Sequence, residues 1–408
     1  MDAVKERIQK RVLDQIDLER DVSDEEVMGL IREEIIREGA DMPLSLAERK
    51  RLGSSIFNSL RKLDVLQELL EAEEVTEVLI NGADAIFVER FGRLERTDRR
   101  FSSEEKLYDV IQQIVARNNR IVNETTPIVD TRLEDGSRVN IVLPPASIDH
   151  CIVTIRRFPK DPINMRRLLS LGSLSEEMAD FLKDLVAAGY NMFVSGGTGS
   201  GKTTFLNALT EFVPPGERVI TIEDSAELQP IGIENLVRLE ARDANLEGKL
   251  RISIRDLVKS ALRMRPDRII VGECRGEEAL EVLQAANTGH DGSLSTGHAN
   301  SCRDMISRLE TMVLMGMELP IAAIRAQIAS GIEIFVHLGR LNDRSRKVLE
   351  IAEVTGVTDG EVKLRTLYVY QSKRDANGKE IGIWKKENDI LNDRKLIMAG
   401  IRKENSPS

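Results

Sequence analysis

The 408-residue sequence has few cysteines, few aromatic residues and no long apolar run, and each shortage excludes a class of protein. Its three cysteines, Cys151, Cys274 and Cys302, are far apart and form no C-x-x-C pair, which argues against a disulfide framework or a zinc knuckle. No segment approaches the roughly 18 apolar residues that a membrane-spanning helix needs. The first residues are charged throughout and lack the apolar core of a secretory signal. We therefore expect a cytoplasmic chain that has no transmembrane segment and meets a membrane only through partners.

Positive charge is also in short supply. The chain has 58 basic and 68 acidic residues, for a net charge of −10, whereas a dedicated nucleic-acid binder usually carries a basic domain. We therefore expect no direct contact with nucleic acid. Charged residues make up 31% of the chain and aromatic residues only 4%, which favours a helix-rich α/β protein of two to three domains.

The amino-terminal part of the chain divides into two predicted segments. Residues 1–70 show helical periodicity, with Ser23 and Glu26 spaced as a capping box, and we interpret them as a helical adaptor without chemistry. Residues 71–160 contain short strand patterns around one amphipathic helix, which predicts a small α/β domain.

Three further segments follow. The proline-containing residues 161–172 are interpreted as a linker. Residues 173–360 alternate short apolar strands with helices, and this alternation predicts a doubly wound α/β domain with a parallel sheet. Residues 361–408 form the tail, where two strand patterns around a turn at Asn377-Gly378 predict a hairpin, followed by a helix.

The segment "GGTGSGKTT" carries the strongest chemical signal in the chain. It matches G-x-x-x-x-G-K-[ST] and lies between an apolar strand and a helix pattern, which is the context that a phosphate-binding loop requires. Glycines let successive backbone N–H groups surround a phosphate, and the following helix adds the positive end of its dipole. Lys202 would reach the β- and γ-phosphates of ATP, and the Thr203 hydroxyl would ligate Mg²⁺. The predicted nucleotide contacts are Gly196, Gly197, Thr198, Gly199, Ser200, Gly201, Lys202, Thr203 and Thr204.

Three carboxylates follow two other predicted strands. "RIIVGE" ends in Glu273, and "RVITIED" ends in Glu223 and Asp224. The carboxyl ends of parallel strands form the ligand-binding edge of an α/β sheet, so these side chains could hold Mg²⁺ or orient the attacking water. The alternative is that they are ordinary surface acids, which are common after strands.

Two histidines, His290 and His298, flank a short alternating strand in "NTGHDGSLSTGHAN". Their spacing fits no zinc motif, and no cysteine lies close by. We expect them to hydrogen-bond near the γ-phosphate or to couple it to a neighbouring subunit. The alternative is a pair of structural histidines whose hydrogen bonds are satisfied within the fold.

The arginines of "DTRLEDGSRVN" and "TIRRF" precede the phosphate loop. They are Arg132, Arg138, Arg156 and Arg157. Judged from the residues alone they are solvated charges on strands. A P-loop ATPase often needs an arginine finger, however, and a small domain before the motor is one donor of such a residue.

Taken in order, the blocks "DGSRVN", "TIRRFP", "GGTGSGKTT", "TIEDSAEL", "RPDRIIVGECRG" and "TGHDGSLSTGHAN" resemble the CpaF/TadA branch of the secretion traffic ATPases, relatives of the VirB-type and GspE/PilT-type motors. The resemblance runs from about residue 65 to about residue 355. The four-cysteine zinc element of the GspE/PilB branch is missing, which moves the interpretation toward the CpaF/TadA and VirB-type side.

The resemblance implies a cytoplasmic homo-hexamer with a RecA-like motor domain, in which ATP binds between the two domains. Hydrolysis would power assembly, and perhaps retraction, of a Tad-type pilus through inner-membrane platform proteins. Alternatives are the ATPase of a type IV secretion system and a nucleic-acid translocase.

The same resemblance assigns roles to single residues. Glu273 would be the Walker B glutamate, and Glu223 and Asp224 would form the acidic box. His290 and His298 would form the histidine box. Arg138 and Arg156 match the arginines of the family's amino-terminal domain that approach the phosphates.

Overall fold

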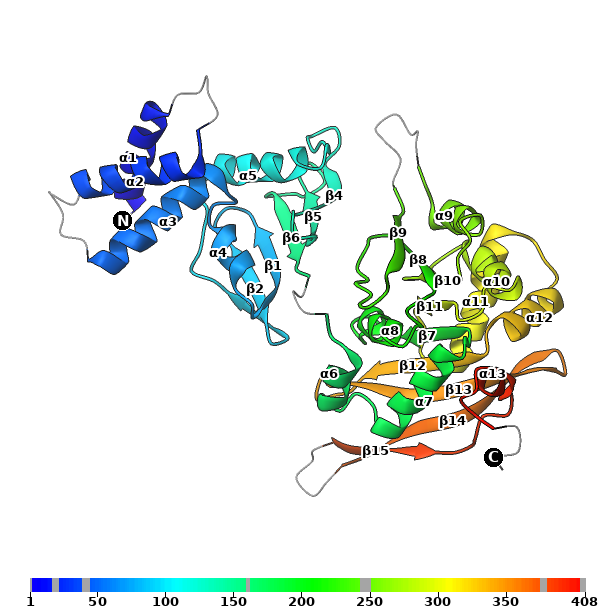
Figure 1. Cartoon of the computed structure of the whole chain (residues 1–408). Helices are drawn as coiled ribbons and strands as arrows, with labels where there is room; N and C mark the ends of the chain where they lie inside the picture. The colour runs from blue at the N-terminus through cyan, green and yellow to red at the C-terminus, as the bar shows by residue number, and fades with distance from the viewer. Residues whose placement is uncertain are drawn as a thin grey trace. The chain divides into compact units, whose positions relative to one another are not determined.

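The computed structural model describes residues 2–16, 22–38, 45–158, 162–242, 251–374 and 380–403. The chain divides into two compact units, Met1–Lys160 and Asp161–Ser408, each with its own core (Figure 1).

The first unit begins with three helices, α1 (Asp2–Gln15), α2 (Asp24–Glu38) and α3 (Leu46–Arg61). They pack around the buried side chains of a small core, which includes Ile8, Val12, Val27, Ile31 and Ile56. The predicted capping box is confirmed at the start of α2. The Glu26 amide donates to the Ser23 hydroxyl at 3.3 Å, and the Ser23 amide donates to the Glu26 carboxylate at 3.0 Å.

The rest of the first unit is a six-stranded sheet in the order β3-β2-β1-β6-β5-β4. Helix α5 (Glu104–Ala116) buries one apolar face in the core of this unit, which also takes residues from the short helix α4 (Leu66–Glu71). The strands are β1 (Val75–Asn81), β2 (Ile86–Arg90), β3 (Arg93–Arg96), β4 (Ile128–Arg132), β5 (Arg138–Val142) and β6 (Ile152–Arg156).

The second unit is built on a nine-stranded sheet in the order β15-β14-β13-β12-β7-β11-β10-β8-β9. The part from β12 to β9 is parallel, and β13 to β15 extend it as antiparallel strands. The parallel strands are β7 (Met192–Gly196), β8 (Arg218–Glu223), β9 (Asn235–Glu240), β10 (Arg268–Val271), β11 (Leu294–Gly297) and β12 (Ile334–Arg340). The antiparallel strands are β13 (Arg346–Thr358), β14 (Glu361–Arg374) and β15 (Glu380–Lys386).

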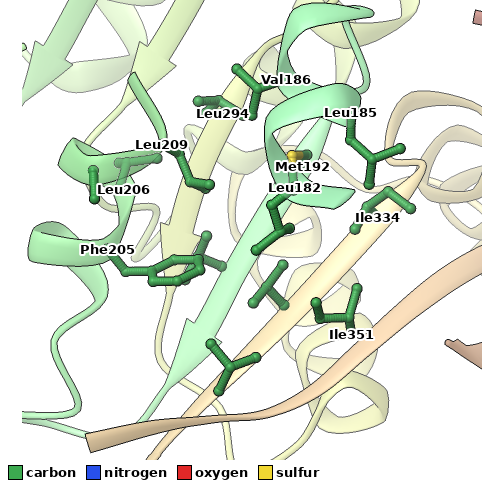
Figure 2. Close-up of a cluster of buried hydrophobic side chains, with 14 of the residues drawn as sticks. Leu182, Leu185, Val186, Met192, Phe205, Leu206, Leu209, Leu294, Ile334 and Ile351 are labelled. Carbon is green, nitrogen blue, oxygen red and sulfur yellow. The ribbon is translucent and has the colours of Figure 1, made fainter. Parts of the chain in front are cut away.

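Helices cover both faces of this sheet, as a doubly wound fold requires. On one face, Leu182 and Leu185 of α7 (Glu176–Ala187) and Phe205 of α8 (Lys202–Thr210) pack on strand residues that include Met192 and Ile334 (Figure 2). Each such side chain contributes about 1.5–3 kcal/mol by leaving water. The other face is covered by α9 (Ile254–Ala261), α10 (Ala279–Asn287), α11 (Cys302–Gly316) and α12 (Ile321–Gly331).

Two segments differ in detail from the sequence-based expectations. The predicted linker contains a helix, α6 (Met165–Ser170), whose first turn is capped by Asn164. The predicted tail adds β14 and β15 to the main sheet and ends in α13 (Arg394–Met398), so the sheet of the second unit continues past residue 360. The two tail strands pair as a hairpin, while the turn predicted at Asn377-Gly378 lies outside the described residues.

Within the described ranges, no one helix is both long and apolar enough to cross a bilayer. The consecutive helices α11 and α12 meet this length and composition test only as a pair, and they are bent by 119° where they join.

Candidate active site

The predicted phosphate loop joins the end of β7 to the start of α8. Strand β7 is buried along its whole length, so the loop rests on a rigid part of the sheet. Gly201 immediately precedes α8 in the left-handed conformation, with φ of 91°, which a residue with a side chain rarely adopts. The glycines of the loop therefore lie where the backbone turns into the amino end of α8. Backbone N–H groups at a helix amino end can bind phosphate oxygens.

Lys202 lies inside this loop and is only 7% exposed. Its ammonium group donates to the carbonyl oxygens of Gly196 and Gly197, each at 3.2 Å, and lies 3.3 Å from Nδ1 of His298. Burial lowers the pKa of Lys202, while the nearby carboxylate of Glu273 acts in the opposite direction. The loop thus holds a cation at the position where the sequence predicts the β- and γ-phosphates.

Glu273 follows β10 and meets two partners at the same edge of the sheet. Its Oε2 accepts a hydrogen bond from Arg275 at 2.8 Å, and its Oε1 lies 2.9 Å from Nε2 of His298. Burial acts to raise the pKa of Glu273, but the hydrogen bond and charge of Arg275 and the nearby charge of Lys202 act together in the opposite direction, and the pKa is lowered. Glu273 is consequently ionised at neutral pH, which suits a carboxylate that orients water.

Glu223, at the end of β8, is 3% exposed. Its Oε1 accepts hydrogen bonds from the backbone amides of Glu227 at 2.8 Å and Leu228 at 2.9 Å. Its Oε2 is buried and has no hydrogen-bond partner among the described residues. Burial raises the pKa of Glu223 to about 6. A Cβ at position 272 would lie 2.8 Å from Cγ of Glu223, which explains why glycine precedes Glu273.

Arg275 connects two of the predicted carboxylates, and sequence reasoning missed it. It donates to Glu273 and, at 3.3 Å, to Oδ2 of Asp224. Its position two residues after Glu273 in "GECRG" was the available signal, but the sequence does not show that the side chain turns back toward both acids. Arg275 and His298 also border an open hollow of about 580 Å³ together with Gly197 and Thr198 of the loop.

The two predicted histidines lie at opposite ends of β11. His298, at the carboxyl end, contacts both Lys202 and Glu273. Burial, together with the charge of Lys202, lowers the pKa of His298, so the ring is neutral at pH 7. His290, before the strand, lies 3.4 Å from the Thr288 hydroxyl. The structure brings His298 to the loop of this chain but not His290, whose role in the site stays a prediction.

The residues fit a magnesium ion held mainly through a nucleotide. No group of three or more His, Cys, Asp or Glu side chains in the described part of the chain could hold a metal by itself. Mg²⁺ in nucleotide sites keeps several waters and takes phosphate oxygens, so few protein ligands are needed. Thr203 in the first turn of α8 offers a hydroxyl, and the buried Oε2 of Glu223 is an acceptor without a partner among the described residues.

The arginines of the first unit form a pair of their own. Arg138 at the start of β5 and Arg156 at the end of β6 are directly opposite in the antiparallel ladder. Arg157 donates to the carbonyl oxygens of Ala72 and Val75 at the end of α4 and the start of β1, so its contacts stabilise that unit.

Comparisons with known proteins show to which family the chain belongs. Residues 60–374 match the protein family described as "Type II/IV secretion system protein". The chain is 35% identical over 310 residues to a putative conjugal transfer protein of Mycobacterium tuberculosis, covering 74% of this chain and 87% of the relative. It is 30% identical over 320 residues to the type IV secretion system protein PtlH of Bordetella pertussis, covering 71% and 93%.

Among solved structures, the pilus retraction motor PilT with bound ADP matches with a TM-score of 0.54 and 18% identity. The match covers 84% of this chain and 87% of that one. At this identity the likeness concerns the fold alone, and it confirms the predicted α/β fold, in which a smaller α/β domain precedes a larger one in the sequence.

Proposed function

The chain belongs to the type II/IV secretion system protein family, and on this premise we propose that it is a Mg²⁺-dependent ATPase whose hydrolysis drives a secretion or pilus machine. The observation that carries the proposal is the cluster of Lys202, His298, Glu273 and Arg275 around one phosphate loop. These side chains come from α8 and from the segments after β11 and β10, and they meet at the carboxyl edge of the sheet.

In the proposed reaction the loop amides and Lys202 bind the β- and γ-phosphates. The ionised Glu273 accepts a hydrogen bond from the attacking water and so directs the water oxygen at the γ-phosphorus, while His298 lies 2.9 Å from the same carboxylate. The water oxygen forms a bond to the γ-phosphorus while the bond between that phosphorus and the bridging oxygen breaks, and the proton of the water ends on the released phosphate, giving ADP and inorganic phosphate. Mg²⁺, when bound through Thr203 and the phosphates, supplies charge neutralisation for the leaving ADP.

Arg275 must change partners for this chemistry to proceed. In the structure its guanidinium donates hydrogen bonds to the carboxylates of Glu273 and Asp224. A γ-phosphate in the adjoining hollow is a stronger competitor for a planar guanidinium than a single carboxylate, because it carries more charge and three acceptor oxygens. We infer that nucleotide binding draws Arg275 toward the phosphate and frees Glu273 for water.

The test is steady-state hydrolysis of ATP by the full chain with and without Mg²⁺. Lys202→Ala should remove both binding and hydrolysis. Glu273→Gln should bind ATP but turn it over at least 100-fold more slowly, because it lacks the charge that orients water. Arg263→Gln, at an exposed position after α9, is the matched surface control. Normal hydrolysis by Lys202→Ala would refute the assignment of the site.

We propose further that the working form is a homo-hexamer and that Arg138 and Arg156 act on the phosphates within it. Their direct pairing across β5 and β6 places two guanidinium groups on neighbouring strands, where both can reach the same ligand, and this supports a shared role. If this is correct, the ATPase activity per protomer should rise with protein concentration as rings form. In Arg138→Ala or Arg156→Ala, sedimentation should still show the ring while hydrolysis falls. An activity independent of concentration across the assembly range would argue against a site completed by assembly.

For the machine itself, we propose a motor of the CpaF/TadA type that powers assembly of a Tad-type pilus from the cytoplasmic face of the membrane. The relatives named for conjugal transfer and type IV secretion favour a type IV secretion ATPase equally, so this is the second candidate. Affinity capture with ATP-loaded Glu273→Gln from solubilised native membranes separates them. Recovery of multi-helix platform proteins with pilins supports the pilus, and recovery of a secretion channel supports the alternative.

A further inference from the structure

The hairpin formed by β12 and β13 is far from the phosphate loop in sequence but lies next to it in space. Strand β12 pairs with β7 as far as Leu338 opposite Gly196, then continues to Arg340, beyond the point where β7 ends. The chain turns within residues 341–345 and returns as β13 from Arg346. The turn is closed by a hydrogen bond from the Leu341 amide to the Ser345 carbonyl at 2.9 Å. The hairpin therefore presents its polar end beside the loop.

Arg346 makes direct contact with the loop. Its Nε donates to the carbonyl oxygen of Gly199 at 2.9 Å, and its Cδ would lie 3.3 Å from a Cβ placed on Gly201. Arg340 approaches the same loop, with Nη1 3.8 Å from a Cβ placed on Gly199. Arg346 is exposed, and within the described ranges it has no carboxylate partner. A guanidinium that has no carboxylate partner among the described residues is thus fixed beside the loop that is predicted to bind phosphate.

The loop has different surroundings on its two sides. On one side Gly197 and Thr198 border the hollow that also contains Arg275 and His298. On the other side Ser200, Gly201 and Thr204 border a second pocket of about 220 Å³, which the hairpin residues Arg344 and Arg346 complete. Because Glu273 and His298 define the side where the γ-phosphate reacts, the α-phosphate of a bound nucleotide faces the second pocket.

We propose that Arg346 contacts the α-phosphate of the bound nucleotide. The inference rests on the proposed ATPase function. The bond from Nε to Gly199 fixes the plane of the guanidinium and leaves its two terminal nitrogens to donate to phosphate oxygens. Arg346 is a binding residue from the same protomer as the loop, and it acts on di- and triphosphates alike.

The test compares three ligands on the full chain by competition with a fluorescent ADP: ATP, ADP and inorganic pyrophosphate. A charge-assisted hydrogen bond to phosphate corresponds to roughly a 10- to 100-fold change in affinity. Arg346→Gln should weaken the binding of ATP and of ADP by this factor. It should weaken the binding of pyrophosphate by less than about twofold, because pyrophosphate fills the β and γ positions. The affinities of Arg346→Lys should lie between those of wild type and Arg346→Gln, and the affinities of exposed Arg263→Gln should equal those of wild type. In hydrolysis, Arg346→Gln should raise KM and leave kcat nearly unchanged.

Two results would overturn the inference. An equal loss for pyrophosphate and ADP would mean that Arg346 only holds the loop in shape through Gly199. Unchanged affinity for all three ligands would mean that it makes no contact with them. Failure of the proposed ATPase function looks different, since wild type would then bind no nucleotide or Lys202→Ala would bind it normally.

Discussion

Replacing Glu223 by glutamine should make the nucleotide-free protein more stable at neutral pH, although it removes a residue of the site. Glu223 is 3% exposed, and burial raises its pKa from an ordinary 4.5 to about 6. Because the folded pKa lies above the unfolded one, folding favours the protonated carboxyl group, and ionisation of Glu223 destabilises the fold as the pH rises through 4.5 to 6. Glutamine keeps an oxygen for the amides of Glu227 and Leu228 and never ionises.

The magnitude follows from the two pKa values. The destabilisation by ionised Glu223 is about 2 kcal/mol at pH 8 and about 0.8 kcal/mol at pH 5, where the folded carboxyl group is mostly protonated. The stability difference between Glu223→Gln and wild type should therefore increase by about 1.2 kcal/mol from pH 5 to pH 8, in favour of the variant. This change with pH is a sharper measure than either absolute value, since it cancels differences in packing between the amide and the protonated acid.

Urea unfolding at the two pH values measures this quantity. Trp384 is the only tryptophan of the chain and lies in β15, so its fluorescence follows the unit that contains Glu223. Exposed Glu318→Gln is the control for the same chemical change at the protein surface. A difference for Glu223→Gln that stays flat, or that shrinks toward pH 8, would refute the account of a buried, partly protonated carboxyl group.

Three further predictions concern neighbours of the site and the tail. Gly272→Ala should destabilise the fold by about 1–3 kcal/mol and lower ATPase activity, because its Cβ displaces Glu223; a melting temperature equal to that of wild type would count against this. Arg275→Gln should shift the acid limb of the pH profile of kcat/KM to higher pH, since it removes the hydrogen bond that lowers the pKa of the glutamate two residues before it; an unmoved limb would contradict that role. Lys395→Met should destabilise the second unit by about 1–2 kcal/mol in urea unfolding, because the largely buried Glu333, paired with Lys395 at 2.6 Å, loses that cation and keeps the hydrogen bond from the Asn191 amide; loss below about 0.3 kcal/mol would show that the tail is not anchored there.

Much of the second unit could be predicted from local sequence. A strand–loop–helix pattern with Lys202 and Thr203 in place specifies a phosphate loop because the chemistry needs a contiguous segment. Glu223 and Glu273 could be predicted to lie near each other because Glu223 ends one apolar strand and Glu273 lies two residues after another, and strand ends meet at one edge of a parallel sheet.

The parts that the sequence did not reveal depend on contacts between distant segments. Arg346 lies 147 residues from Gly199, and only the overhang of the β12–β13 hairpin brings them together. Arg275 lies near Glu273 in sequence, but its contact with Asp224 depends on the order of β10 and β8 in the sheet. His290 shows that nearness in sequence can mislead. It lies only eight residues before His298, but β11 runs between them and places the two histidines at opposite edges of the sheet.

The most direct test of the central claim is single-turnover hydrolysis of radiolabelled ATP by wild type, Lys202→Ala and Glu273→Gln, with nucleotide binding measured on the same samples. The account predicts that wild type binds and hydrolyses, Lys202→Ala does neither, and Glu273→Gln binds without hydrolysis. If Glu273→Gln hydrolysed ATP at the wild-type rate, the carboxylate held by His298 and Arg275 would not be the group that orients water.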